Sequence, residues 1–180
     1  MPRRGLLALV VLLLVVVTTA SAAPDADGRN TVASSVTRVG SLEQLLLRQI
    51  NAVRAANGLA TLSRSTALTR AAAHHSHAMA AFGFFTHESR DGGSFSERVG
   101  RFYRPRLRAW SIAENLAVFG GGAPDASSIV KGWMDSPPHR ANILGRAFRE
   151  AGLAVVHHPA AGGVFGGQPT CVITLDLGAR

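Results

Sequence analysis

The chain has 180 residues, with 19 basic and 11 acidic residues and a formal net charge of +8 at pH 7. The basic residues are scattered rather than packed into a run, and no nucleic-acid-binding motif accompanies them, so binding to nucleic acid fits poorly. A single cysteine, Cys171, excludes an internal disulfide, and the fold must stand on packing alone. Its apolar surroundings, TCVITLDLG, favour a buried structural thiol over a catalytic nucleophile.

Residues 1–22 have the three-part layout of a secretory signal peptide. Arg3 and Arg4 precede an apolar run at residues 6–17, and small residues follow directly. The run is shorter than the roughly 20 apolar residues of a spanning helix, which favours cleavage over a membrane anchor. Cleavage after Ala22 would leave 158 residues, enough for one domain. We therefore expect a secreted protein that meets the membrane only through its cleaved leader.

Residues 23–40 lack apolar periodicity and predict a flexible leader, followed by one domain over residues 41–180. Ser41 and Gln44 have the spacing of a capping box, which predicts the start of a helix. Asn57-Gly58 predicts its end through a left-handed cap.

A second helix is predicted from about Ser63 to about Ala81. Its apolar stripe follows helical spacing and consists of Leu68, Ala72, His75, Met79 and Phe82. This register turns His75 toward the core. His74 and His77 lie on other faces of the helix, and His157-His158 alternate along a strand, so neither group predicts a metal cluster.

The remaining predicted elements are helices and strands, and the last two are strands. Ser94 and Glu97 predict a capping box for a short helix, and AWSIAENLAVFG predicts a strand. A helix capped by Ser127 or Ser128 ends at Pro137-Pro138, and HRANIL adds one turn. AGLAVVHH and PTCVITLDLG predict two strands joined by a glycine-rich hairpin loop. Helices first and strands last favour an α+β fold with an antiparallel sheet.

Three segments place a titratable side chain at the edge of a regular element: His87 in FFTHES, Glu114 in AENLA and His139 in WMDSPPHRANIL. Histidine and carboxylate together can bind a divalent cation or exchange protons as acid and base. Each residue also has a structural alternative: a solvated loop histidine, a carboxylate that ties strand to loop, and a cap of the next turn. Spacing alone does not bring the three together, and HExxH and paired CxxC motifs are absent.

In this order the three segments resemble the bacterial branch of the CAP superfamily, which includes cysteine-rich secretory, antigen five and pathogenesis-related proteins. That branch has patterns close to FFSHxSxDG, GENxA and WMxSxxHRxNIL, followed by strands. The present chain has FFTHESRDG, AENLA and WMDSPPHRANIL, and the match extends from about Ser41 to about Gly178. The resemblance implies a three-layer α-β-α sandwich with a central, mainly antiparallel sheet.

The resemblance also implies a cleft lined by two histidines and two glutamates. Carried over, the histidines are His87 and His139, and one glutamate is Glu114. The second acid falls on Ser136 and is missing, while Asp135 beside it points about 100° away if the helix continues. We expect Ser136, Asp135 and Asn115 to line the cleft. Ala113 where glycine is usual, and the absence of the disulfides found in animal and plant members, are further departures.

Two imidazoles and one carboxylate could hold zinc with water completing the site, whereas magnesium would bind more weakly. Three functions stay open. The first is a binding module for lipid, peptidoglycan or a partner protein. The second is a metal-dependent hydrolase or peptidase that uses His87, Glu114 and His139, although no GxSxG motif or supported Cys-His pair supplies a nucleophile. The third is a structural network around a vestigial cleft.

Overall fold

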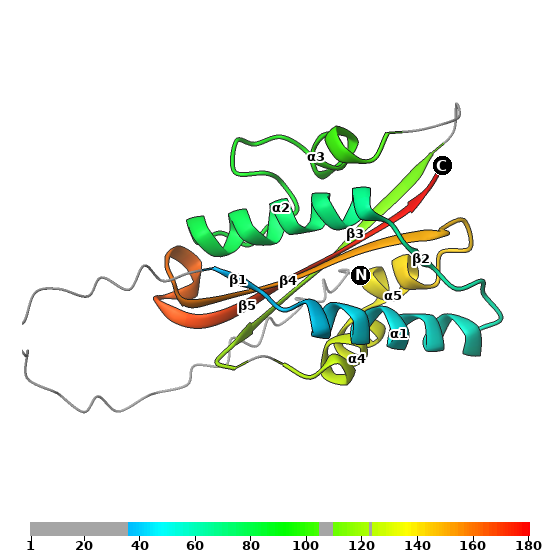
Figure 1. The fold of residues 1–180 in the computed structure, drawn as a ribbon, viewed down its shortest axis with the longest axis horizontal. Coiled ribbons are helices and arrows are strands. Elements are labelled where there is room, and N and C mark those ends of the chain that lie inside the picture. Colours follow the sequence, from blue (N-terminus) through cyan, green and yellow to red (C-terminus); the bar gives the residue numbers. More distant parts are fainter. Residues whose placement is uncertain (1–35, 105–109, 123) are drawn as a thin grey trace, which may run out of the picture. The chain divides into compact units, whose positions relative to one another are not determined.

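The computed structural model describes residues 36–104, 110–122 and 124–180 (Figure 1). The predicted signal peptide, residues 1–22, and most of the predicted leader lie outside these residues. Within the described part of the chain, no helix has the length and apolar character needed to cross a membrane.

A five-stranded sheet forms the centre of the domain. Its order is β1-β4-β5-β3; β2 pairs with β4 in parallel, and all other pairs are antiparallel. A short 3₁₀ turn, Gly163–Phe165, lies in the β4–β5 hairpin loop. The strands are β1 (Thr37–Arg38), β2 (Ser63–Arg64), β3 (Ser111–Gly120), β4 (Glu150–Ala161) and β5 (Gln168–Ala179).

Helices cover both faces of this sheet. In Figure 1, α2 and α3 lie on one side, and α1, α4 and α5 on the other. The predicted α+β class and three-layer sandwich are therefore confirmed. The helices are α1 (Gly40–Ala56), α2 (Thr66–Phe82), α3 (Phe95–Phe102), α4 (Ala126–Asp135) and α5 (Pro137–Ile143).

Strand β5 separates two apolar cores because it is central and buried on both faces. Ile173 and Leu175 pack in the cluster that contains Ile50 of α1 and Trp133 of α4. Val172, on the opposite face, packs with Met79 of α2. Alternation along β5 therefore places residue 176 on the face toward α2 and α3. Cys171 is buried, which confirms the packing interpretation, and burial raises the pKa of its thiol.

Two predicted features near the start of the domain are wrong. Thr37–Arg38 pair with β4, so the last part of the expected leader belongs to the sheet. Helix α1 begins at Gly40 without a side-chain cap, and the Ser41 capping box does not form. The reason is the short connection: Val39 donates its N–H to the Val155 carbonyl, 2.9 Å away, and is also the N-cap of the helix.

The other helix boundaries follow local chemistry. The Ser94–Glu97 capping box forms at α3 as predicted, and Gly58 adopts a left-handed φ of 67° after α1. Ser65 caps α2, because Ser63 is taken up by the pairing of β2. Asp125 caps α4 in place of the predicted serines, with its Oδ1 2.9 Å from the Ser128 amide.

Helix α2 lies so close to β4 that only glycine fits at position 152. A Cβ there would overlap the backbone of Leu68 and Thr69. Gly152→Ala should therefore lower the free energy of unfolding by about 2 kcal/mol or more, as expected for overpacking. Gly132→Ala on α4 is the matched control, because a Cβ at Gly132 meets nothing within 4 Å. It should raise stability by about 0.5–1 kcal/mol. Urea denaturation measures both, and equal stability of the two variants would contradict the packing argument.

Candidate functional site

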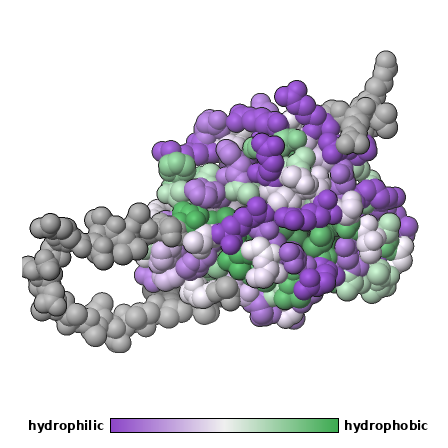
Figure 2. Space-filling model, viewed as in Figure 1, coloured by the Kyte–Doolittle hydropathy of each residue, from purple (hydrophilic) through white to green (hydrophobic). Residues whose placement is uncertain are grey.

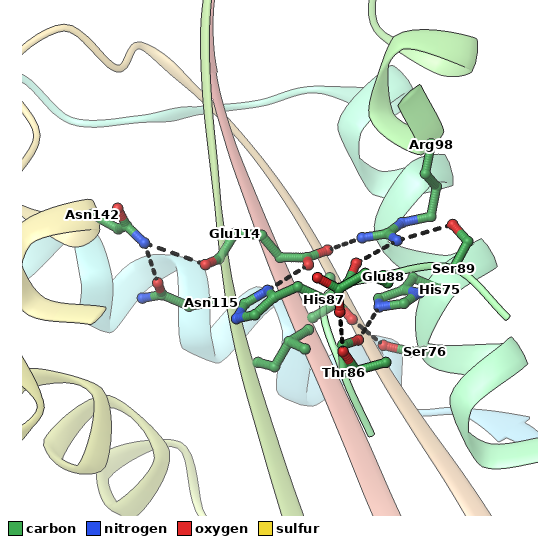
Figure 3. Close-up of polar contacts among 12 residues, drawn as sticks. His75, Ser76, Thr86, His87, Glu88, Ser89, Arg98, Glu114, Asn115 and Asn142 are labelled. Atoms are coloured by element: carbon green, nitrogen blue, oxygen red, sulfur yellow. Dashed lines mark hydrogen bonds and ion pairs between the residues drawn. The ribbon is translucent and has the colours of Figure 1, made fainter. Parts of the chain in front are cut away.

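His87 and Glu114 are in direct contact. His87 lies in the loop between α2 and α3, and Glu114 lies in β3 (Figure 3). The His87 Nδ1 is 2.8 Å from Glu114 Oε1, with the imidazole 49% exposed and the carboxylate 1% exposed. An ionised carboxylate only accepts hydrogen bonds, so Nδ1 carries the proton and Nε2 is the nitrogen left to act on a ligand.

A buried arginine that the sequence interpretation missed holds the other side of this carboxylate. Arg98 of α3 donates from Nη2 to Glu114 Oε2 at 2.5 Å and from Nη1 to the His87 carbonyl at 2.8 Å. Its side chain is 1% exposed. A sequence signal existed, because Arg98 falls on the helical face of Phe95, Val99 and Phe102. An arginine on an apolar stripe indicates a buried partner.

A second missed acid, Asp176, lies opposite Glu114 in the β3–β5 register. Asp176 is fully buried, and no backbone N–H or cationic side chain among the described residues donates to its carboxyl oxygens. Its carboxyl group instead contacts that of Glu114. Burial, and then the charge of Glu114, raise the pKa of Asp176 well above its usual value. Burial opposes ionisation of Glu114 too, but the His87 hydrogen bond and the Arg98 charge lower the pKa of Glu114 overall. Thus Glu114 is the ionised member and Asp176 the protonated member of the pair.

The pKa values of the histidines are shifted in opposite directions. The hydrogen bond to Glu114 raises the pKa of His87 against the effect of burial. Burial, and then the charge of His87, lower the pKa of His139. Burial also lowers the pKa of His75 to about 4. The Nε2 of neutral His75 is 2.8 Å from the Thr86 carbonyl, next to His87, so it fixes the loop that carries the site.

Side-chain amides join α5 to the outer edge of β3. Asn142 Nδ2 donates to the Glu114 carbonyl at 3.2 Å and to Asn115 Oδ1 at 2.8 Å. Asn115 Nδ2 donates to the His139 carbonyl at 3.0 Å. Trp133 Nε1 of α4 donates to the Leu116 carbonyl at 3.0 Å on the same strand. These contacts set the position of His139 relative to Glu114.

The predicted site residues divide between two hollows. His87 and Glu114 line one of about 390 Å³, together with Asn142, which the sequence did not single out. His139 and Ser136 line another of about 280 Å³, whose walls are largely apolar. His139 Nδ1 is 2.9 Å from the Oγ of Ser136, the residue at the position where the family resemblance places a second acid.

Two residues expected to line the cleft lie outside both hollows. Asn115 is fully buried because its amide is used between β3 and α5. Asp135 is 63% exposed and forms an ion pair with Lys131 at 2.5 Å, one helical turn earlier. The Asp135 side chain points away from Ser136, as helical geometry predicts, and therefore also away from the cleft.

The arrangement of Glu114 does not suit a direct role as a metal ligand. Its two oxygens contact His87 and Arg98, and within residues 36–104, 110–122 and 124–180 no group of three His, Cys, Asp or Glu side chains could hold a metal ion. Both imidazoles use Nδ1 within the protein, on Glu114 and on Ser136. A metal here would be held by the Nε2 atoms, with Glu114 orienting one ring.

A comparison with protein-family models identifies the family of this chain. The model of the cysteine-rich secretory protein family, CAP, matches residues 47–171, a range that contains His87, Glu114, Ser136 and His139. The chain belongs to the CAP family.

Two relatives of this CAP domain come from Bacillus subtilis (strain 168). It is 32% identical to the uncharacterized protein YkwD of Bacillus subtilis (strain 168) over 137 residues, which are 76% of this chain and 51% of YkwD. It is 28% identical to the uncharacterized membrane protein YlbC of the same organism over 113 residues, or 63% of this chain and 31% of YlbC. The chain therefore spans about half the length of one relative and under a third of the other.

Solved structures confirm the CAP fold. An extracellular protein containing an SCP domain from Bacillus anthracis (strain Ames) matches with a TM-score of 0.60 and 22% identity, over 78% of this chain and 41% of that protein. An outer surface protein from Borrelia burgdorferi matches with a TM-score of 0.61 and 15% identity, over 81% of this chain and 99% of that protein.

Replacing Asp176 by its neutral isostere tests the carboxyl pair. A raised pKa in the folded state means that folded Asp176 keeps a proton that the unfolded chain has released, so its contribution to stability falls as the pH rises above about 4. Asp176→Asn should therefore be more stable than wild type at pH 8, with a difference that shrinks toward about pH 4. Denaturation at a series of pH values measures it, and a difference independent of pH would contradict the assignment.

Proposed function

We propose that this CAP domain is an exported ligand-binding module whose cleft takes a ligand with an apolar segment and a polar end. The contact that carries the proposal is the half-exposed His87 imidazole held by Glu114. The charge of His87 acts on His139, which lines the apolar hollow. Phe85 and Val118 are exposed by 39% and 37% and line that hollow with His139. Apolar walls with a few polar groups are typical of small-ligand sites.

Export is supported by two independent features. The first 22 residues have a signal-peptide layout, and the similar structures include an extracellular protein and an outer surface protein. The apolar walls favour lipid over peptidoglycan or a partner protein as the ligand. The apolar chain would lie along Phe85 and Val118, and the polar end would accept or donate at His87 Nε2.

A fluorescent fatty acid, cis-parinaric acid, tests this proposal. His87→Asn should weaken its binding about tenfold, because the polar end loses a charge-assisted hydrogen bond. His77→Asn is the matched control, since His77 is exposed on α2, and its affinity should stay within about twofold of wild type. Fluorescence titration gives both constants. Equal binding by wild type and His87→Asn would contradict the proposal, and wild type that binds purified sacculi but not the fatty acid would replace lipid with cell wall.

Metal binding is a separate proposal that rests on the two Nε2 atoms. In histidine NMR spectra, zinc should shift the ring signals of His87 and His139. The ring signals of His157 and His158 should stay unchanged. Ser136→Glu would restore the acid that the family pattern places there, and should tighten zinc binding by about tenfold through added negative charge. Zinc that perturbs His157 or His158 first would contradict this placement.

Hydrolysis is the second candidate function. It is favoured by the Glu114–His87 contact, in which a carboxylate orients a ring whose other nitrogen is available as a base. The raised pKa of His87 means that it would act as a base only above the usual histidine range. Turnover of ester or peptide substrates that is lost in His87→Asn would replace binding with catalysis.

A further inference from the structure

A larger hollow, separate from the cleft, lies between α2, α3 and the loop that joins them. Its volume is about 550 Å³, within the usual range for small-ligand sites. Its lining residues include none that line the two cleft hollows. The surface of the α2–α3 layer is largely hydrophilic in Figure 2.

An exposed aromatic residue forms part of this hollow. The helical stripe predicted Phe82 in the core, but Phe82 is 57% exposed, so that prediction is wrong. The stripe extends one turn too far, because α2 ends at Gly83, whose left-handed backbone turns the chain away. The guanidinium of Arg90 lies 4.0 Å from the centre of the Phe82 ring. Arg90 covers one face of this ring, so the ring of a ligand would stack on the other face.

The charges around this surface favour an anion. Arg90 and Arg101 line the hollow, and Asp91 is the acid that lines it with them. Arg101 and Asp91 are 4.0 Å apart and both mostly exposed, so their pairing is weak. Asp91 Oδ1 also accepts the Gly93 amide at 3.1 Å, within its own turn. The result is an excess of one positive charge, on guanidinium groups whose geometry suits carboxylate or phosphate oxygens.

The wall of the hollow is preformed. Ser89 Oγ accepts a hydrogen bond from Arg98 Nη1 at 3.2 Å, which fastens the loop to the buried cluster. The Ser89 amide donates to the Gly93 carbonyl, and the Gly92 amide to the Ser89 carbonyl, both at 2.8 Å. A ligand would therefore meet a fixed surface and would not have to order the loop.

We propose that this hollow is a second ligand site of the protein and binds a small aromatic anion, with its ring on Phe82 and its acidic group on Arg101. The site needs neither a metal nor an occupied cleft. It therefore stands or fails independently of the function proposed for His87.

The probe is 2-naphthoate, followed by ¹H–¹⁵N NMR titration of the protein. Saturable shifts should centre on α2 and on residues 89–91, with a millimolar Kd. The neutral analogue 2-naphthalenemethanol should bind about fivefold more weakly, and acetate, which has no ring, should cause no saturable shift below about 10 mM. Shifts of 2-naphthoate that centre on His87 and His139, or that fail to saturate, would overturn the proposal.

Two variants measure separately how much Arg101 and Phe82 contribute to the binding of 2-naphthoate. Arg101→Gln should weaken 2-naphthoate about fivefold and leave 2-naphthalenemethanol unchanged, while Phe82→Ser should weaken both about tenfold. Arg146→Gln is the matched control, an exposed arginine that does not line the hollow, and should have no effect beyond about twofold. Both test positions are exposed, so the fold should persist, which unfolding midpoints verify. Equal weakening by Arg101→Gln and Arg146→Gln would indicate unspecific charge attraction and overturn the site.

Discussion

The interaction on which the site depends is the buried pair of Arg98 and Glu114. A charged carboxylate within a strand is costly unless a cation compensates it, and breaking such a pair by removing one partner typically costs about 3–5 kcal/mol. Here Arg98 reaches across from α3 to supply the charge, and the same guanidinium holds the His87 carbonyl and Ser89. One residue therefore fixes the carboxylate, the loop and the orientation of the imidazole.

The protonation of Asp176 explains how one arginine, Arg98, can balance the charge of two neighbouring carboxyl groups. Asp176 lies opposite Glu114 on the neighbouring strand, and two ionised carboxylates so close would repel each other. Protonation of Asp176 leaves one negative charge for Arg98 and allows Glu114 to orient His87. The family pattern expects a second acid at position 136, where this chain has a serine. Asp176 does not replace it, because Asp176 is fully buried, whereas Ser136 lines a hollow.

The sequence could predict the parts of the fold that depend on local spacing. The stripe of α2 placed His75 in the core, and the Ser94–Glu97 box predicted the start of α3. It could not predict that Glu114 faces Asp176, because strand register is set by pairing between segments far apart in the chain. For the same reason it could not predict that the Asn115 amide binds α5. Motif resemblance supplied His87 and Glu114, and without it their contact would have had no basis in spacing.

The amides that join α5 to β3 have a consequence for self-association. Strand β3 is at the edge of the sheet, and an open edge exposes backbone groups on which another chain could add a strand. Asn142 occupies the Glu114 carbonyl and Trp133 occupies that of Leu116, two successive outward-facing acceptors. Asn142 and Trp133 therefore leave these two carbonyls unavailable to a strand of another chain, which disfavours edge-to-edge association along this part of β3.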